Sequence, residues 1–241
     1  MLSTLHRLFL PLIVALTAPG SLLAANGDTT ATKEREPYFK YYTGNTFETA
    51  MLSTSTIDRE MAGSQKPPEA ALRFTMFTSV GLTFNFNTSR HFGFYTGISI
   101  KNLGFTEKTD SFTIKRRVYA LGVPVGIRVG KMTFPEWHIM AGGGVDIPFN
   151  YGEKQYHDRA HKTKVSEWFS ERTPHIMPYC FIGAKLTPAI SLKLQYYPGN
   201  FLNNNFTKES VKPYAGYEVH VILITIGIHL NFTDMKDFTV S

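Results

Sequence analysis

Two histidines in this chain have a spacing that could support metal chemistry. His157 and His161 lie four residues apart in a polar segment. The three residues between them, 158–160, lack the glutamate of a zinc protease motif, and no further ligands accompany the pair. The glycine run 142–144 lies inside an expected strand and is not followed by a helix, so it does not form a phosphate-cradling loop. The sequence therefore predicts neither a metal nor another cofactor.

A serine nucleophile with a histidine base would support hydrolysis or acyl transfer, and the chain has candidates for both groups. His175 and His220 are the candidate bases, and Ser166, Ser170 and Ser210 are the nearby serines. A nucleophile needs its base within hydrogen-bond reach, and the base needs an orienting group. No elbow motif surrounds any of these serines. We therefore expect solvated loop serines and a protein that is not an enzyme.

The elements that would position these residues follow a two-residue hydrophobic period. From Ile222 to Phe232 every second residue is apolar, and every polar residue after His220 occupies the other positions. Successive side chains of a strand point to opposite faces, whereas a helix would mix the two sets. One face suits lipid and the other suits a wet interior. This segment therefore predicts a membrane-spanning β-strand.

The same period recurs in six further segments, which are 72–86, 92–103, 118–130, 137–151, 175–186 and 190–197. An even number of strands needs one more, and it can only lie between Tyr38 and Thr54, where the pattern is weak. The predicted fold class is all-β, an eight-stranded antiparallel up-and-down transmembrane β-barrel. A soluble sandwich or a lipocalin-like barrel is the alternative.

Three features of the pattern predict local detail. Phe77 is the one large apolar residue on the polar side of its strand. Pro124 cannot donate to a ladder, so we expect a β-bulge there. Trp137 and Tyr151 are about fourteen residues apart, which on a tilted strand matches an apolar band roughly 25 Å tall. We expect both aromatic residues to face outward, one in each interface girdle.

The expected lumen is biased toward basic residues. Its ionisable residues are Arg73, Lys101, Arg116, Arg128, His138, Asp146, Lys185, Lys193 and His229, with Glu48 as a further candidate. Eight strands leave room only for side chains or one small ligand, and charges there must be paired or hydrated. We expect Asp146 and Glu48 to neutralise arginines in a structural network. A basic conduit for anions is the alternative. Inward glycines would either relieve crowding or outline a cavity.

Short and long connections alternate between the expected strands. The short ones are 87–90, 131–134 and 187–189, and the long ones are 55–71, 104–112, 152–173 and 198–217. With both chain ends in the periplasm, the turns lie inside and the loops outside, as in bacterial outer-membrane barrels. The loops are polar, and we expect them to be solvated rather than core-forming.

The first 25 residues have the layout of a secretory signal peptide. Arg7 precedes an apolar run, 8–16, that is too short for a membrane helix, and small residues end at Ala25. The expected organisation is a signal peptide (1–25), a periplasmic segment (26–40), the barrel (41–232) and a tail (233–241). A single cysteine excludes an intramolecular disulfide, and a formal charge of +6 does not suggest nucleic acid.

Several short motifs resemble the porin-like outer-membrane β-barrel family of Gram-negative bacteria. They are RFT at 73–75, GFYTG at 93–97, KNLGF at 101–105, YALGVPVG at 119–126, QYY at 195–197 and NFLN at 200–203. The resemblance covers roughly residues 40 to 232. It implies an outer-membrane location and insertion by the barrel-insertion machinery. One departure is the end of the chain, because such proteins often finish on an aromatic residue and nine residues follow Phe232 here.

The resemblance implies a location and an architecture more than an activity, because one barrel fold carries many functions. Our first hypothesis is a non-enzymatic integral outer-membrane protein with a structural, envelope or surface-binding role. The alternatives are a narrow solute channel with a basic lumen and a lipid-modifying enzyme at the external rim. The expected partners are outer-membrane lipid, the insertion machinery and an extracellular ligand or envelope protein, but not nucleic acid.

Overall fold

The computed structural model describes residues 39–59, 69–71, 73–108, 112–156, 162–230 and 236–237. The expected signal peptide, almost all of the segment 26–40 and most of the tail lie outside these residues. His157, His161 and Phe232 also lie outside them. Among the residues described, no helix is long and apolar enough to cross a bilayer.

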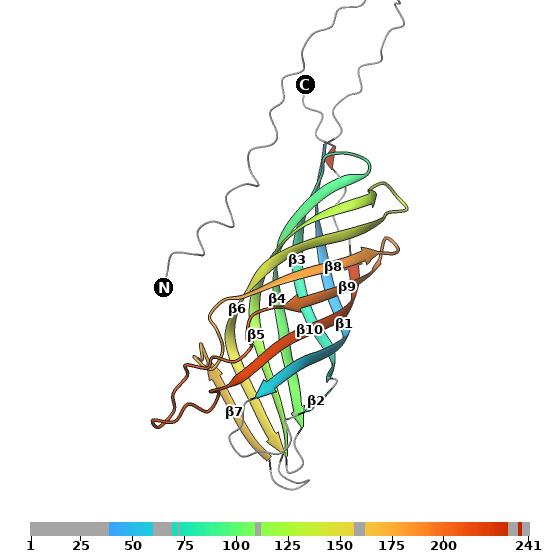
Figure 1. Ribbon diagram of the computed structural model, residues 1–241. Helices are drawn as coiled ribbons and strands as arrows, with labels where there is room; N and C mark the ends of the chain where they lie inside the picture. The colour runs from blue at the N-terminus through green and yellow to red at the C-terminus, as the bar shows by residue number, and fades with distance from the viewer. Residues whose placement is uncertain are drawn as a thin grey trace, which may run out of the picture. The chain divides into compact units, whose positions relative to one another are not determined.

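All regular secondary structure in the described residues is β-strand (Figure 1). The strands are β1 (Lys40–Arg59), β2 (Glu69–Ala71), β3 (Arg73–Asn87), β4 (Phe92–Lys108), β5 (Thr113–Lys131), β6 (Trp137–Tyr156), β7 (Lys162–Trp168), β8 (Met177–Lys185), β9 (Ile190–Tyr197), β10 (Tyr217–Leu230) and β11 (Lys236–Asp237).

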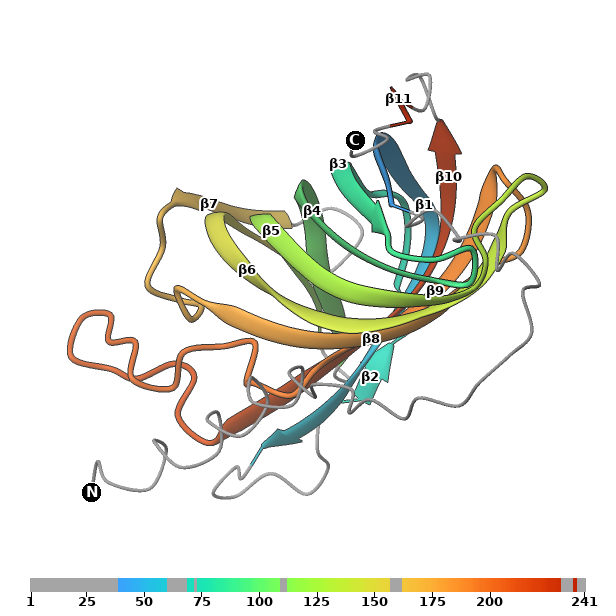
Figure 2. The ribbon, with the colours of Figure 1, turned by 90° about the horizontal axis from the view of Figure 1, so that it is seen from above.

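Eight of these strands close into a ring. The order is β1, β3, β4, β5, β6, β8, β9 and β10, each antiparallel to the next, and β10 pairs back with β1 (Figure 2). The other three strands are short extensions: β2 pairs with β4, β7 with β6, and β11 with β1. The predicted eight-stranded barrel is confirmed, including its weakly patterned first strand.

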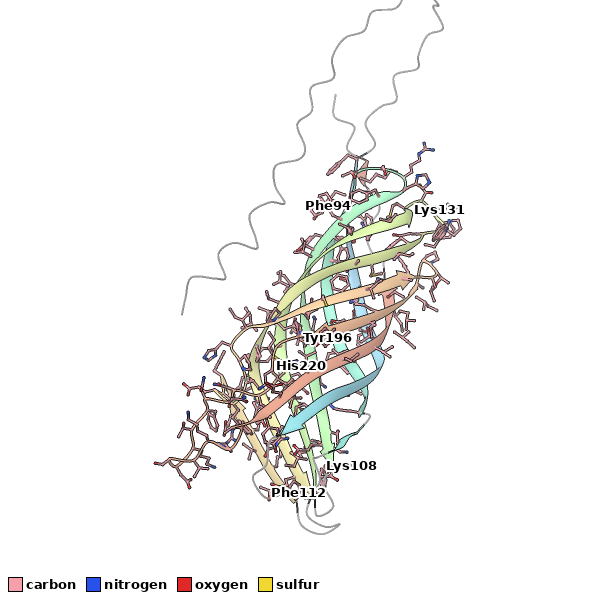
Figure 3. The ribbon with its side chains drawn as sticks, in the orientation of Figure 1. Phe94, Lys108, Phe112, Lys131, Tyr196 and His220 are labelled. Atoms are coloured by element: carbon pink, nitrogen blue, oxygen red, sulfur yellow. The ribbon has the colours of Figure 1, made fainter. Side chains whose placement is uncertain are left out.

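The two ends of the barrel differ. Tight turns at 88–91, 132–136 and 186–189 join strands at the turn end, where Figure 3 labels Phe94 and Lys131. Lys108 and Phe112 mark the opposite, loop end (Figure 3). There β4, β5 and β6 continue as paired strands, and β7 adds to β6, so much of the expected loops 104–112 and 152–173 is strand. These extensions lie beyond the apolar pattern, which is why the period does not mark them.

The outer face of the ring is apolar. Strands β3, β4, β5, β6, β8, β9 and β10 all present exposed aliphatic side chains. Examples are Val80, Leu82, Ile98, Ile100, Leu121, Val125, Ile127, Ile139, Ile147, Ile182, Leu192, Leu194, Ile224, Ile226 and Ile228. A soluble protein would not leave such a continuous band in water, whereas lipid solvates it. The inward and outward sets match the predicted period for these strands except beyond two shifts in pairing, in β3 and in β6.

A shift in pairing between β5 and β6 reverses the pattern near the loop end. Tyr119 pairs with Asn150 but Ala120 pairs with Pro148, which leaves Phe149 as an extra residue. One extra residue turns every later side chain to the other face. Tyr151 therefore points inward and is 1% exposed, so the expectation that it belongs to an interface girdle is wrong.

The aromatic residues on the outer face at the loop end are different ones. The ring of Phe149 stacks on Tyr119 at 6.4 Å and on Trp168 at 6.0 Å between centroids. Trp137, at the turn end, is 54% exposed. Aromatic side chains thus lie on the outside at both ends of the apolar band, which is where membrane interfaces hold them.

A second shift, between β1 and β3, explains Phe77. Glu48 pairs with Ser79 but Thr49 pairs with Phe77, so Thr78 is the extra residue. The ring of Phe77 then lies beside Phe47 on the outer face, 5.8 Å between centroids. No such shift occurs at Pro124, because the register between β4 and β5 is the same on both sides of it. The bulge expected at Pro124 is wrong.

The same shift moves Arg73 out of the lumen. Its Nη2 donates a hydrogen bond to Oδ1 of Asn102 at 3.3 Å. Asn102 follows Lys101, and the two side chains point to opposite faces of β4 because successive residues alternate. Lys101 reaches into the lumen, so Arg73 lies on the outer side. The inward placement expected for Arg73 is wrong.

We predict that Ile224→Arg destabilises the barrel by about 2 to 4 kcal/mol, because Ile224 is 41% exposed to lipid near the middle of β10. Thr225→Val is the matched control, since Thr225 is 0% exposed and its hydroxyl has no hydrogen-bond partner. Urea unfolding in lipid vesicles measures both, with the folded fraction read from the heat-sensitive band shift on a detergent gel. Equal losses from the two variants would contradict the assignment of faces.

Candidate functional site

The lumen is the site where charged side chains gather. The predicted inward residues that lie there are Glu48, Lys101, Arg116, Arg128, His138, Asp146, Lys185, Lys193 and His229. They alternate along their strands with the lipid-facing residues, so the outer apolar set fixes their direction. Apart from His229, they belong to three clusters at successive levels between the turn end and the loop end.

The central cluster joins β4, β6 and β9. Nζ of Lys101 lies 3.0 Å from Oδ1 of Asp146, whose side chain is 0% exposed. The hydroxyl of Tyr197 donates to Oδ2 of Asp146 at 2.5 Å. Lys101 also donates to Oε1 of Gln195 at 3.4 Å. The buried carboxylate of Asp146 therefore links three strands of the barrel, β4, β6 and β9.

Glu48 extends this cluster to β1. Its carboxylate pairs with Lys193 of β9 and accepts a hydrogen bond from Nε2 of Gln195 at 3.4 Å. Gln195 thus connects the Glu48 pair with the Lys101 pair. The sequence predicted Glu48 and Asp146 as the neutralising acids, but it predicted arginines as their partners, and both partners are lysines.

Inward glycines make room for the central cluster. A Cβ atom at Gly122 would lie 2.5 Å from Oδ1 of Asp146, and one at Gly142 would lie 2.8 Å from the ring of Phe181. Side chains from other strands occupy the space that a larger side chain at either glycine would need. Of the two predicted roles, relief of crowding is the one that the structure supports at these positions.

The turn-end cluster is built on Glu136, in the turn between β5 and β6. Lys185 donates to its Oε2 at 2.7 Å, and Nδ1 of His138 lies 3.2 Å from its Oε1. Arg128 Nη1 lies 3.7 Å from the same oxygen and donates to the Tyr42 hydroxyl at 2.7 Å. Glu136 is not on a strand face, so strand periodicity could not identify it.

The loop-end cluster contains two further acids that the pattern missed. Arg116 pairs with Glu107 and, through Nε at 3.1 Å, with Glu153. Tyr217 donates to Glu107 at 3.1 Å and Tyr151 donates to Glu153 at 2.6 Å. Both acids lie in segments that were expected to be loops, beyond the recognisable apolar period.

The segment between β9 and β10 packs against this cluster. Phe201, Leu202 and Tyr214 are buried, and the Phe201 ring meets Phe105 of β4 edge-on at 5.2 Å between centroids. The Tyr214 hydroxyl accepts a hydrogen bond from Arg172 at 2.9 Å. The expectation of a fully solvated loop is wrong here, because a few apolar residues without a period anchor an otherwise polar segment.

A cavity of about 70 Å³ remains between the central and turn-end clusters. It is enough for several water molecules, since about 10 to 15 Å³ of such space suffices for one. Cationic and anionic groups both line it, including Lys101, Arg128, Lys185, Lys193 and Glu48. This space suits hydration of the charged network.

One serine–histidine pair borders this cavity, and sequence reasoning missed it. Nε2 of His229 lies 2.7 Å from Oγ of Ser191, which is buried. In the described part of the chain, no carboxylate forms an ion pair with His229, so the orienting group of a triad is lacking. The contact is a hydrogen bond between neighbouring strands. Ser191 of β9 pairs with Gly227 of β10, and His229 lies two residues further along β10 on the same face.

The serines and histidines predicted at the loop end do not meet. Ser170 Oγ donates to Oε2 of Glu167 at 2.7 Å. Within the described ranges, neither His175 nor His220 has a hydrogen bond to a serine, and no group of three or more potential ligands could hold a metal ion. The geometry of a serine hydrolase is therefore not assembled from these predicted residues.

A closed barrel with an apolar outer band, aromatic residues at both rims and a polar, filled interior is an integral outer-membrane β-barrel. The apolar outer face excludes the soluble alternative, because a lipocalin-like barrel buries its apolar side chains inside. The class and the outer-membrane location expected from the sequence are confirmed.

Comparisons with known proteins give fold likeness only. No family model and no curated protein matches the chain. Similar solved structures include Ail, the attachment invasion locus protein of Yersinia pestis, at 10% identity over 79% of this chain and 99% of Ail, with a TM-score of 0.34. Neisserial surface protein A shares 12% identity over 80% of this chain and 97% of its own, with a TM-score of 0.36. The outer membrane protease OmpT of Escherichia coli shares 10% identity over 80% of this chain and 97% of its own, with a TM-score of 0.33. Such values transfer no function to this chain.

We predict that Lys101→Met destabilises the barrel by about 3 to 5 kcal/mol, because it leaves the Asp146 carboxylate buried without its cation. The double variant Lys101→Met/Asp146→Leu should lose less than the sum of the two single variants, since neither charge is then left alone. Urea unfolding in vesicles measures the cycle, with exposed Lys208→Met as the control. Wild-type stability in Lys101→Met would mean that the network is not structural.

We also predict a loss of stability in acid that depends on Glu136. Burial raises the pKa of this carboxyl, but the neighbouring His138 and Lys185 lower it more, to about 2 from the ordinary 4.5. The folded state therefore gains stability above the unfolded pKa and loses it as the pH falls from 4.5 toward 2. Unfolding free energies across this range should fall less steeply for Glu136→Gln than for wild type. An identical slope in both proteins would contradict this role.

Proposed function

We propose that this protein is a non-enzymatic integral outer-membrane barrel with a sealed lumen, which serves envelope structure or surface binding through its loop end. The carrying observation is the network of buried charges in the lumen. The ion pairs Lys101–Asp146 and Glu48–Lys193 each join strands two places apart in the ring, and the hydrogen bond from Lys101 to Gln195 joins the opposite strands β4 and β9. A linked network of this kind fills a narrow lumen and stiffens the barrel, which favours a structural role for the lumen and leaves binding to the loop end.

The loop end supports the surface-binding part of the proposal. Phe201, Leu202 and Tyr214 anchor the segment between β9 and β10, while residues 207–213 are exposed. Lys208 and Val211 bridge to each other across a tight turn in which Glu209 and Ser210 have positive φ angles of 51° and 65°. A defined tip on a buried base is a form in which a loop can present side chains to a partner at small entropic cost.

The two alternatives have less support. A solute channel with a basic lumen needs cations that are free to attract anions, and the lysines that line the cavity between the clusters are already paired with carboxylates. An enzyme needs a nucleophile that a substrate can reach, and Ser191, which has a histidine partner, is buried. The sealed barrel needs neither feature.

We predict that wild-type protein in planar lipid bilayers gives no stable conductance steps at neutral pH. The triple variant Lys101→Ala/Asp146→Ala/Tyr197→Ala removes the side chains that cross the lumen and should give small steps if it still inserts. Insertion is checked by the heat-sensitive band shift on a detergent gel. Stable, anion-selective steps from the wild-type barrel would replace this proposal with the channel alternative.

A further inference from the structure

The outer surface at the loop end carries a group of basic side chains, here called the outer basic cluster. Its members surround a hollow of about 190 Å³ and come from four strands, β3, β5, β6 and β7. They are Arg73, Lys115, Arg117, Lys154 and Lys164. This cluster takes no part in the lumen network.

The members of the cluster share the outer face. Along β5, Lys115 and Arg117 alternate with Arg116 and Val118, which are buried inside the barrel. A Cβ atom at Gly152 would lie 3.1 Å from Nε of Arg117, so the Arg117 side chain lies across β6 at that glycine. The cluster side chains therefore leave their strands on the face opposite to Arg116, although Arg116 and Glu153 also border the hollow.

The three lysines of the cluster form a row across paired strands. Lys115 of β5 pairs with Lys154 of β6, and Lys154 pairs with Lys164 of β7. Directly paired residues of antiparallel strands point to the same face, and like charges in that position are destabilising. A row of three such charges is therefore unfavourable unless an anion lies against it.

No protein anion fills this role in the part of the chain that the structure describes. None of the five cluster members forms an ion pair there, whereas Lys101, Arg116, Lys185 and Lys193 inside the barrel all do. Nη1 of Arg73 is buried and has no hydrogen-bond partner. Glu153, beside the hollow, is already engaged by Arg116 and Tyr151.

The position of the cluster identifies the missing anion. The Arg117 guanidinium lies 5.3 Å above the ring of Tyr119, which belongs to the outer aromatic stack with Phe149 and Trp168. Aromatic girdles lie at the level of the lipid headgroups. Basic residues just beyond a girdle lie where lipid phosphates are found, and each contributes attraction to an anionic surface.

We propose that the outer basic cluster binds the phosphate of an anionic lipid headgroup in the outer leaflet. The phosphate neutralises the row of lysines and accepts hydrogen bonds from Arg73 and Arg117. Arginine forks suit phosphate oxygens, and lysines add point charges around them. This site is separate from the lumen, so it stands whether or not the barrel proves to be sealed.

The test uses full-length protein in a zwitterionic detergent, with phosphatidic acid as the probe. The variant is Lys115→Gln/Lys154→Gln/Lys164→Gln, and the matched control removes three exposed cations elsewhere, Arg90→Gln/Lys208→Gln/Lys212→Gln. Native mass spectrometry titrates bound lipid, and thermal unfolding reports stabilisation. We expect at least about tenfold weaker lipid binding for the cluster variant and near wild-type binding for the control.

A second measurement separates loss of binding from loss of fold. Without lipid, the cluster variant should melt at or above the wild-type temperature, because the repulsion among the three lysines is gone. A lower lipid-free melting temperature, or equal lipid binding by both variants, would overturn the proposal. Equal stabilisation of wild type by phosphatidylcholine, or by inorganic phosphate alone, would also overturn it, since the site would then not select an anionic lipid.

Discussion

Closure of the sheet is the constraint on which the rest of this structure depends. Within lipid no water can satisfy an open strand edge, so β10 must pair with β1, and it does so along most of the length of both strands. Closure with eight strands fixes a narrow lumen and gives every strand one face toward lipid. The alternation of side chains, the inward glycines and the need to pair each inward charge all follow from that geometry.

The narrow lumen explains the form of the charged network. Asp146 and Glu48 each pair with a lysine, and Gln195 links the two pairs because it accepts a hydrogen bond from Lys101 and donates one to Glu48. Two further cations pair with acids from outside the apolar period: Lys185 with Glu136, which lies in a turn, and Arg116 with Glu107, which lies in a strand extension.

The two faces of the barrel treat basic residues differently at the loop end. Arg116, inside, is enclosed by carboxylates and tyrosines, whereas Arg117, the next residue, lies outside among other cations above an aromatic ring. Alternation along one strand thus separates a charge that holds the protein together from a charge that faces its surroundings. The outer charges have lipid headgroups as their natural counterpart, which connects the barrel to the membrane it spans.

The sequence by itself determined the class, seven of the eight strands and the direction of most side chains, because the two-residue period is local and lipid demands it. It placed Lys101, Asp146 and Lys193 in the lumen for this reason. The first strand followed from the even number of strands that a closed barrel needs. Tertiary structure alone decided the faces of Arg73 and Tyr151, because the extra residues at Thr78 and Phe149 exist only relative to a paired strand. It also decided the role of Glu136, since a turn has no period and its neighbours come from distant strands.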